Sequence, residues 1–418
     1  MSITNKTVSK RDNSHVDLRD TKLIYRLVLI SLLMACSYFF AADMFAPSLP
    51  FIVDAFSSTA STVQQTISVF FVSVACSQLV VGVASERFGR RPLVLIGAVV
   101  FVVGTLVCLF STNITMLIIG RCIQGIGVSA LYLLCFTILQ DSLSKEELIG
   151  ILAWFSILFM SIPALAPAIG GLLQSYLGWR SNFKFMLVLS LLILLFTFLF
   201  LTETHTQKNP DALVMKTLVA DYWMIIKNPI FWIYLLMMVA ASGGIMIFYI
   251  IGSFVSFHDY GLEPKSFGLT SILIVSCTIA SRLFFSYYLK THVTKRRMLL
   301  TGGAMMLVAS GLLVLNIELH LFTLMLIAIC LYAFSSGLLT ATAAVSALYL
   351  FPNHKGQVGA TFGALQMLGL FSLTQLSAHL PDTELVLASM FIALSVLTLL
   401  SQCYPGFVKH VKAESLYK

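Results

Sequence analysis

Charge is scarce in this sequence. Asp, Glu, Lys and Arg together make up 11% of its 418 residues, whereas 58% are hydrophobic. Soluble globular domains carry roughly 25% charged residues, so this chain cannot cover a soluble surface. We predict an all-α integral membrane protein. The formal net charge is +8. The basic residues are concentrated in alternate loops, as expected for a membrane protein whose cytoplasmic loops are rich in Lys and Arg. We therefore predict no nucleic-acid partner.

Catalytic and metal-binding patterns are also missing. The eight cysteines lie in apolar runs without a CxxC spacing, so they are interpreted as small hydrophobic residues and not as a metal or disulfide framework. The sequence has no GxSxG elbow, no HExxH zinc pair and no P-loop for ATP. We therefore expect neither an enzyme nor a bound cofactor or metal.

Long apolar runs account for most of the chain. Twelve of them are long enough to cross a bilayer, which takes on the order of 20 helical residues. They cover residues 25–45, 62–84, 92–111, 114–138, 148–174, 182–202, 229–256, 266–289, 297–316, 320–346, 356–379 and 384–404. The sequence thus predicts twelve transmembrane helices in two six-helix halves.

An internal repeat supports the two halves. RRPLVLIGAVV begins at Arg90 and RRMLLTGGAMM begins at Arg296, an offset close to half the chain length. Parallel repeats occur in transporters that bind their substrate between the halves. The expected divisions are a cytoplasmic tail 1–22, an N-terminal half 23–202, a central cytoplasmic loop 203–228, a C-terminal half 229–404 and a cytoplasmic tail 405–418.

The basic residues predict the orientation. If the N-terminus is cytoplasmic, 21 of the 26 Lys and Arg residues fall in cytoplasmic segments and three in outer loops. Such an excess is expected on the inner side, so we predict a multi-pass protein of the bacterial inner membrane with both termini in the cytoplasm. Of the two arginines within spans, Arg121 is expected to need a partner or a cavity, with snorkelling as the alternative. Arg282 is expected to snorkel, with a substrate-binding or coupling charge as the alternative.

One acid lies in the interior of a predicted span, and it is Asp43 in YFFAADMFAPSLP, whereas Glu384 stands at the end of its span. Its distance along the first span places it in the outer part of the helix and not at the midplane. An Asp at a helix centre costs about 2.5–3.5 kcal/mol on translocon scales, so a functional reason is expected. Two interpretations stay open: a protonation site tuned by a nearby Arg121, or a residue that orients the turn at Pro47 and Pro50.

Three further motifs concentrate in the N-terminal half. In GVASERFGRR the glycines permit a tight turn, and Glu86 is expected to pair with the arginines or with a helix N-terminus. In RCIQGIGVSA the small residues favour close helix packing, and in IPALAPAIGG the prolines should kink the helix. The residues concerned are Gly82, Glu86, Arg87, Gly89, Arg90 and Arg91; Arg121, Gln124, Gly125 and Gly127; and Pro163, Pro167, Gly170 and Gly171.

Polar and aromatic residues on apolar helices are candidates for a substrate cavity. The same residues could instead serve helix packing or face lipid, and the sequence does not separate these roles. The candidates are Tyr132, Trp154, Phe155, Tyr249 and Gln366.

These motifs resemble motifs A, B and C of the major facilitator superfamily. ADMFAPSLP and the APxxGG ending of motif C resemble the bicyclomycin- and chloramphenicol-resistance (Bcr/CflA) branch of its drug:proton antiporters. Glu86 stands where the family has Asp, Ala166 where motif C has Gly, and Phe45 where the branch has Tyr. The resemblance implies alternating access of two rocking halves, proton coupling at Arg121 and antiport.

The leading hypothesis is a proton-coupled antiporter that exports small amphipathic molecules or drugs. Its partners would be a small-molecule substrate, protons and the lipid bilayer, and we expect a monomer. A dedicated metabolite or siderophore transporter of the same fold, working by export or by symport, is the alternative. A membrane receptor or scaffold without transport is the third hypothesis.

Overall fold

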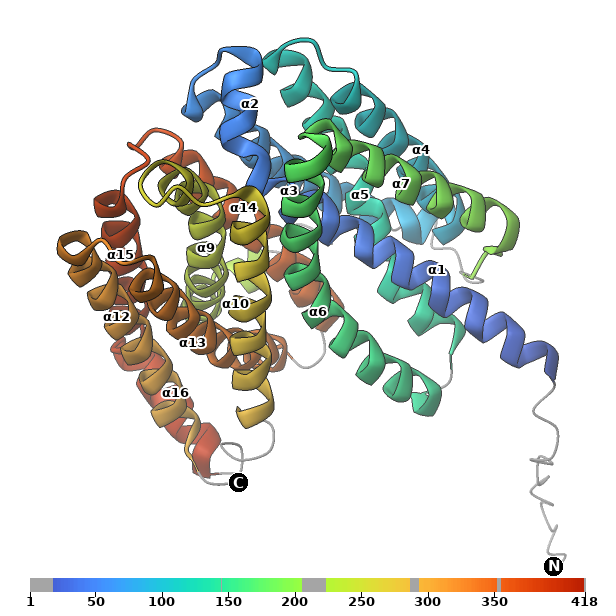
Figure 1. The fold of residues 1–418 in the computed structure, drawn as a ribbon. Coiled ribbons are helices and arrows are strands. Elements are labelled where there is room, and N and C mark those ends of the chain that lie inside the picture. The colour runs from blue at the N-terminus through green and yellow to red at the C-terminus, as the bar shows by residue number, and fades with distance from the viewer. Residues whose placement is uncertain (1–17, 144, 205–222, 286–292, 352–354, 417–418) are drawn as a thin grey trace, which may run out of the picture.

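The computed structural model describes residues 18–143, 145–204, 223–285, 293–351 and 355–416. Its first half contains α1 (Leu18–Asp43), α3 (Ala60–Phe88), α4 (Arg90–Leu109), α5 (Ile114–Ser142), α6 (Lys145–Leu177) and α7 (Arg180–Phe200). Its second half contains α9 (Pro229–His258), α10 (Pro264–Phe284), α12 (Lys295–Leu319), α13 (Phe322–Tyr349), α14 (Lys355–Ser377) and α15 (Glu384–Gln402). These long helices confirm the twelve predicted ones (Figure 1).

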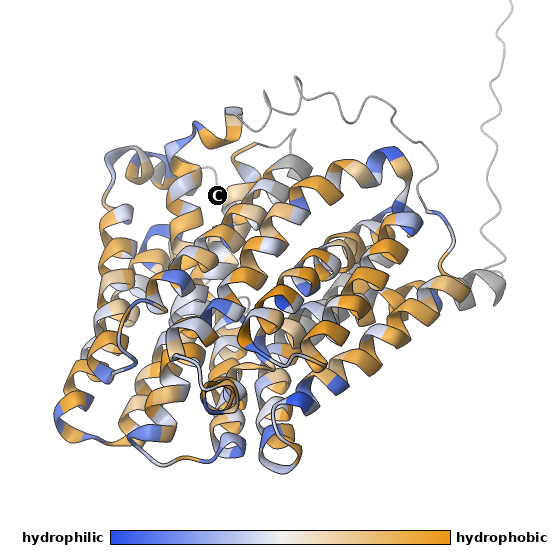
Figure 2. Ribbon diagram, turned by 90° about the horizontal axis from the view of Figure 1, so that it is seen from above, coloured by the Kyte–Doolittle hydropathy of each residue, from blue (hydrophilic) through white to orange (hydrophobic). Residues whose placement is uncertain are grey.

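Length and apolar composition suit most of these helices to a bilayer. Within the described residues, ten spans qualify to cross a membrane on those two criteria, and α6 and α14 occupy the remaining two predicted positions. Figure 2 shows hydrophobic residues along the helices and hydrophilic ones mainly towards their ends. Large apolar side chains such as Val188, Phe198 and Leu400 are exposed on the outside, where a bilayer would cover them.

The first span is longer than predicted. After α1 ends at Asp43, a short 3₁₀ helix η1 (Ala46–Ser48) and α2 (Leu49–Phe56) continue it, and the apolar segment covers Ile24–Phe56. The prediction that it ends at residue 45 was wrong, because Pro47 and Pro50 do not terminate it. Each proline stands in the first turn of a new short helix, where the missing N–H has no partner to lose.

The two halves repeat one packing pattern. In the first half α4 packs on α5 and α7, and in the second half α12 packs on α13 and α15. The repeated sequences that begin at Arg90 and Arg296 therefore start the third long helix of each half. The predicted tail 405–418 is largely a helix, α16 (Pro405–Leu416), which packs on α12 and α9.

The backbones of α4 and α5 approach closely because glycines line their contact. A side chain on Gly127 would collide with the backbone of Phe101, and one on Gly104 would collide with the backbone of Gln124. A side-chain carbon on Gly97 would lie 2.7 Å from the Cβ of Ala130. Small residues at such a contact let membrane helices gain van der Waals packing where lipid offers no hydrophobic drive.

The halves meet through α3 with α14 and α6 with α10. Hydrogen bonds join them towards the end of the bundle that carries α2, which we call the α2 end. Gln64 Nε2 donates to Asp382 Oδ1 at 2.7 Å and the Lys265 amide donates to Ser175 Oγ at 3.1 Å. At the opposite end, which carries α16, the ribbons of the halves diverge (Figure 1). The α2 end is thus the closed end.

We expect Gly127→Ala to destabilise the fold. The added carbon collides with backbone that cannot rotate away, and overpacking of this kind costs about 1–3 kcal/mol. Thermal unfolding of the purified protein in detergent measures the effect. Gly311→Ala is the matched control, because a side-chain carbon on Gly311 meets nothing within 4 Å. Equal melting temperatures for the two variants would contradict the close contact.

We also expect acid to favour the closed α2 end. Burial raises the pKa of the Asp382 carboxyl to about 6, although the bond from Gln64 and the nearby His258 act to lower it. Opening would expose Asp382 and return its pKa to about 4. The closed end therefore binds more protons, and its population relative to the open end should rise roughly tenfold as the pH falls from about 7 to about 5.

Spin-label distances between the halves at the α2 end, recorded across this pH range, check the expectation. Asp382→Asn should flatten the pH response, whereas Asp54→Asn should preserve it, because Asp54 is an exposed acid at the same end. A pH response that persists unchanged in Asp382→Asn would refute the assignment.

Candidate functional site

A cavity of about 460 Å³ lies between the halves. Its described wall draws on both halves, including residues of α1, α5 and α6 on one side and of α9, α10, α13 and α14 on the other. The wall is mainly apolar and aromatic, and a few polar groups converge on it. This is the usual composition of a small-molecule site.

Asp43 lies in the wall of this cavity at the end of α1. Its side chain is buried, and within the described chain it has no hydrogen-bond or ion-pair partner. Because the apolar segment continues beyond it to Phe56, Asp43 lies further from the end of the span than predicted. No side-chain capping bond forms at the start of η1 or of α2, and no hydrogen bond of Asp43 that would orient the turn at Pro47 and Pro50 is observed among the described residues.

Aromatic rings form the cavity wall beside Asp43. Tyr38 and Tyr132 stack with their ring centroids 4.4 Å apart, and the Tyr38 hydroxyl donates to Met367 Sδ across the halves at 3.1 Å. The structure places Tyr132, Tyr249 and Gln366 in the wall, as the sequence suggested. The side chains of the other two candidates, Trp154 and Phe155, lie outside the described residues.

Arg121 is fully buried, so snorkelling was the wrong alternative. Its Nη1 donates to Gln124 Oε1 at 3.0 Å and its Nε to the Thr66 carbonyl at 3.3 Å. The guanidinium also lies over the rings of Phe45 and Phe70, at 5.2 and 4.4 Å from their centroids. These contacts supply partners of the kind that a charge within a membrane needs, although Nη2 is buried without a hydrogen bond.

Asp43 and Arg121 are not brought into contact. Arg121 is not among the described residues of the cavity wall, and no ion pair joins it to Asp43. Phe45, two residues after Asp43, lies under the guanidinium instead. Direct tuning of Asp43 by an adjacent Arg121 is therefore not observed, and Phe45 in the helix break is the contact of Arg121 that lies nearest to Asp43 in the sequence.

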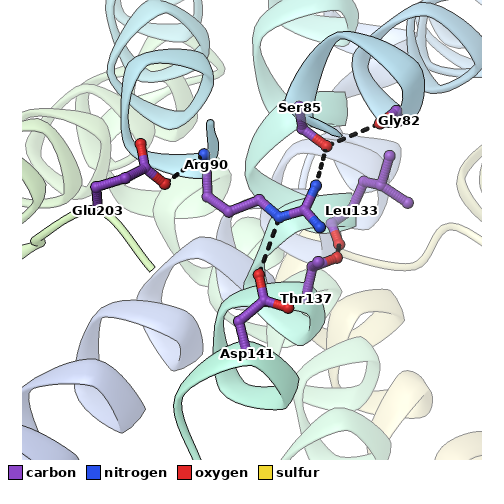
Figure 3. Close-up of polar contacts among 7 residues, drawn as sticks. All are labelled: Gly82, Ser85, Arg90, Leu133, Thr137, Asp141 and Glu203. Carbon is purple, nitrogen blue, oxygen red and sulfur yellow. Dashed lines mark hydrogen bonds and ion pairs between the residues drawn. The ribbon is translucent and has the colours of Figure 1, made fainter. Parts of the chain in front are cut away.

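Arg90 organises the connection between α3 and α4 (Figure 3), and Gly89 precedes it at the end of α3. Gly89 ends α3 with a φ of +103°, a backbone conformation that favours glycine. The Arg90 amide donates to Glu203 Oε1 at 2.8 Å, and its guanidinium donates to Asp141 Oδ2 at 3.0 Å and to Ser85 Oγ at 2.5 Å. The loop thereby ties α3, α4 and α5 to the residues that follow α7.

Glu86 forms neither of the expected contacts, with the arginines or with a helix N-terminus, among the described residues. The side chain is exposed, and among the described residues it forms no ion pair. The carboxylate at the N-terminus of α4 is that of Glu203, and the acid that pairs with Arg90 is Asp141. The sequence does contain a signal for Glu203, since it is the first acid after a long apolar run, but only the fold brings it beside Gly89.

The neighbouring arginines have separate partners. Arg91 Nη2 donates to the Phe198 carbonyl near the end of α7 at 3.2 Å, and the Arg87 guanidinium lies 5.6 Å from the ring centroid of Phe88. Gly82 sits within α3, where a side-chain carbon would lie 3.6 Å from Leu133. The motif is therefore a set of helix-to-helix contacts at the α16 end.

The proline- and glycine-rich motif of α6 lies at the interface between the halves. The helix runs unbroken through Pro163 and Pro167, and Pro163 lines the cavity. A side chain on Gly170 would collide with the Met44 carbonyl, and one on Gly171 would collide with the carbonyl that begins α10 in the other half. These glycines allow α6 to touch both the helix break that follows α1 and the second half of the protein.

Gly125 gives α5 a similar close contact with α3. A side-chain carbon on Gly125 would lie 2.7 Å from the carbonyl oxygen of Phe70 and 2.8 Å from the Cβ of Ser73. The small residue expected to favour helix packing therefore does so, on the same helix that carries Arg121.

Arg282 also lies in the cavity wall, in the last turn of α10. Its Nη2 donates to Thr340 Oγ1 at 3.2 Å, and its Nε is buried without a partner. The described residues contain no group of three or more His, Cys, Asp or Glu side chains that could hold a metal ion. The cavity chemistry thus rests on single charges and hydroxyl groups.

The chain is similar to drug-resistance proteins along most of its length. It is 27% identical over 362 residues to multidrug resistance protein D of Escherichia coli (strain K12), covering 85% of this chain and 89% of that protein. It is 26% identical over 331 residues to a bicyclomycin resistance protein homolog of Haemophilus influenzae, covering 78% and 82%. A chloramphenicol resistance protein of Pseudomonas aeruginosa is 29% identical over 231 residues, 54% of this chain and 53% of that protein.

Solved transporters share the fold. A crystal structure of the nucleoside transporter NupG matches with a TM-score of 0.73 at 11% identity, covering 91% of this chain and 99% of that one. The inward open conformation of the xylose transporter XylE from E. coli matches with a TM-score of 0.70 at 14% identity, covering 90% and 95%. The family model described as Major Facilitator Superfamily matches residues 31–373. The chain therefore belongs to the major facilitator superfamily.

Proposed function

We propose that this secondary transporter is a proton-coupled antiporter that exports small amphipathic molecules or drugs. The observation that carries the proposal is Asp43, an acid in the wall of a cavity between the two halves that has no partner among the described residues. A carboxyl group that can gain and lose a proton beside a binding cavity can link proton movement to substrate release. The multidrug, bicyclomycin and chloramphenicol resistance named for its relatives favours drugs as substrates.

Access to the cavity would alternate between the two ends. With the termini in the cytoplasm, as the distribution of Lys and Arg favours, the closed α2 end faces outwards and the cavity receives substrate from the cytoplasm. Export then requires the α2 end to open while the Arg90 network approaches the other half. In a bacterium this transporter would lie in the inner membrane and use the proton gradient across it.

Arg121 would contribute by holding the helix break in place. Its guanidinium contacts Phe45 and Phe70 and bonds to α3 and α5. If protonation of Asp43 moves η1, Phe45 would transmit that movement to Arg121 through their contact. This gives Arg121 a positioning role in coupling, separate from direct contact with the proton.

A dedicated metabolite or siderophore transporter is the second candidate. The departures at Phe45, Glu86 and Ala166 from the drug-exporting pattern favour it. A deletion strain tested for drug susceptibility and for loss of a secreted metabolite would separate the two candidates.

We expect Asp43→Asn to abolish substrate-induced proton release while the protein still folds, because the amide keeps the shape of the side chain but cannot ionise. The measurement uses inverted membrane vesicles, an entrapped pH indicator and a drug identified from the susceptibility panel. Asp259→Asn is the matched control, since Asp259 is an exposed acid in the loop after α9. Proton release that is unchanged in Asp43→Asn would disprove the coupling role.

A further inference from the structure

Arg282 forms one hydrogen bond and no ion pair with the described residues. It is half-buried in the cavity wall, its one described hydrogen bond goes to the neutral hydroxyl of Thr340 at 3.2 Å, and its Nε is buried without any bond. A guanidinium has five N–H donors and no acceptor. The buried Nε is the donor without a bond, and in a mostly apolar wall an unpaired buried donor is costly unless an acceptor enters the cavity beside it.

The cavity separates its two charges. Among its described lining residues Asp43 is the one acid, from the first half, and Arg282 is the one base, from the second half, and no ion pair joins them. Arg282 is in the last turn of α10, towards the α16 end, whereas Asp43 lies next to the helix break that leads to the closed α2 end. A ligand entering from the α16 end therefore meets the positive charge first and the negative charge deeper in the cavity.

Apolar and aromatic side chains lie in the wall with these charges. They include the stacked rings of Tyr38 and Tyr132 and the flexible side chains of Met238 and Met246. Methionine adapts to ligands of different shape, and a ring face offers a surface for an aromatic group. The buried hydroxyl of Tyr249 has no partner among the described residues and can add one hydrogen bond.

We propose that the cavity selects amphipathic ligands that carry both a carboxylate and an amine, with Arg282 binding the carboxylate and Asp43 binding the amine. This inference rests on the transport function proposed above and specifies the substrate class of the same cavity. A bidentate contact between the guanidinium and a carboxylate would occupy the donors that the protein leaves free. A ligand with an amine alone would leave Arg282 unpaired and bind less tightly.

Two dansyl compounds that differ only by the carboxylate test the proposal. Nε-dansyl-lysine carries an amine and a carboxylate, and dansylcadaverine is the same molecule without the carboxylate. Their dissociation constants are measured by fluorescence on the full chain purified into lipid nanodiscs. We expect the wild-type protein to bind Nε-dansyl-lysine about tenfold more tightly, the size of one charge-assisted hydrogen bond.

Arg282→Gln should remove this preference by weakening the binding of Nε-dansyl-lysine alone, and Arg282→Lys should retain part of it. Arg297→Gln is the matched control, because Arg297 is an exposed base at the start of α12. It removes one positive charge from the same half and should leave the preference intact. If Arg282→Gln fails to fold, the Lys variant still tests the role, since a point charge lacks the planar fork of a guanidinium.

Several outcomes would overturn the proposal. They are equal affinity of the wild-type protein for the two compounds, binding of neither compound, and an equal loss for both compounds in Arg282→Gln, which would indicate a merely structural role. Proton release from vesicles is a separate measurement. Its persistence in Asp43→Asn would refute the coupling role of Asp43 and leave the carboxylate preference standing.

Discussion

A charge within the bilayer needs a partner, and this requirement organises the protein. Hydrocarbon offers an ionised group no hydrogen bonds, so each charged side chain inside the bundle has to be surrounded by protein groups or face a cavity. The structure uses both solutions. Arg121 is enclosed by a carbonyl, an amide and two aromatic rings, whereas Asp43 and Arg282 face the cavity between the halves.

Enclosed charges and cavity charges have different roles. Enclosed charges fix helices relative to one another within a half: Arg121 joins α5 to α3, and Arg90 joins α4 to α5 and to Glu203. The charged groups on the cavity, Asp43 and Arg282, have donors or acceptors that remain free to bind a ligand or a proton. A rigid half that carries an unsatisfied charge on its inner face is suited to recognising a ligand without rearranging itself.

Movement of the halves depends on how closely they touch. Gly171 and Gly268 bring α6 and α10 together backbone to backbone, and a bond from Gln64 to Asp382 closes the α2 end. Contacts between small residues involve few interlocked side chains, so they can separate and reform at modest cost. Within the first half, by contrast, the glycines of α4 and α5 give a close packing that supports movement as one body.

The sequence by itself determined the twelve helices, the two repeated halves and the family, because long apolar runs, a repeated basic pair and ordered motifs are local patterns. It also singled out Asp43 and Arg121, since a charge in an apolar run is visible without a structure. It misjudged the end of the first span, because Pro47 and Pro50 begin new short helices that extend the apolar segment beyond α1. Only the tertiary structure decided which charges meet. Glu203 replaces Glu86 beside α4, Arg121 lies apart from Asp43, and Arg282 faces the cavity. These outcomes depend on how helices distant in the sequence rotate and pack, which no single helix encodes.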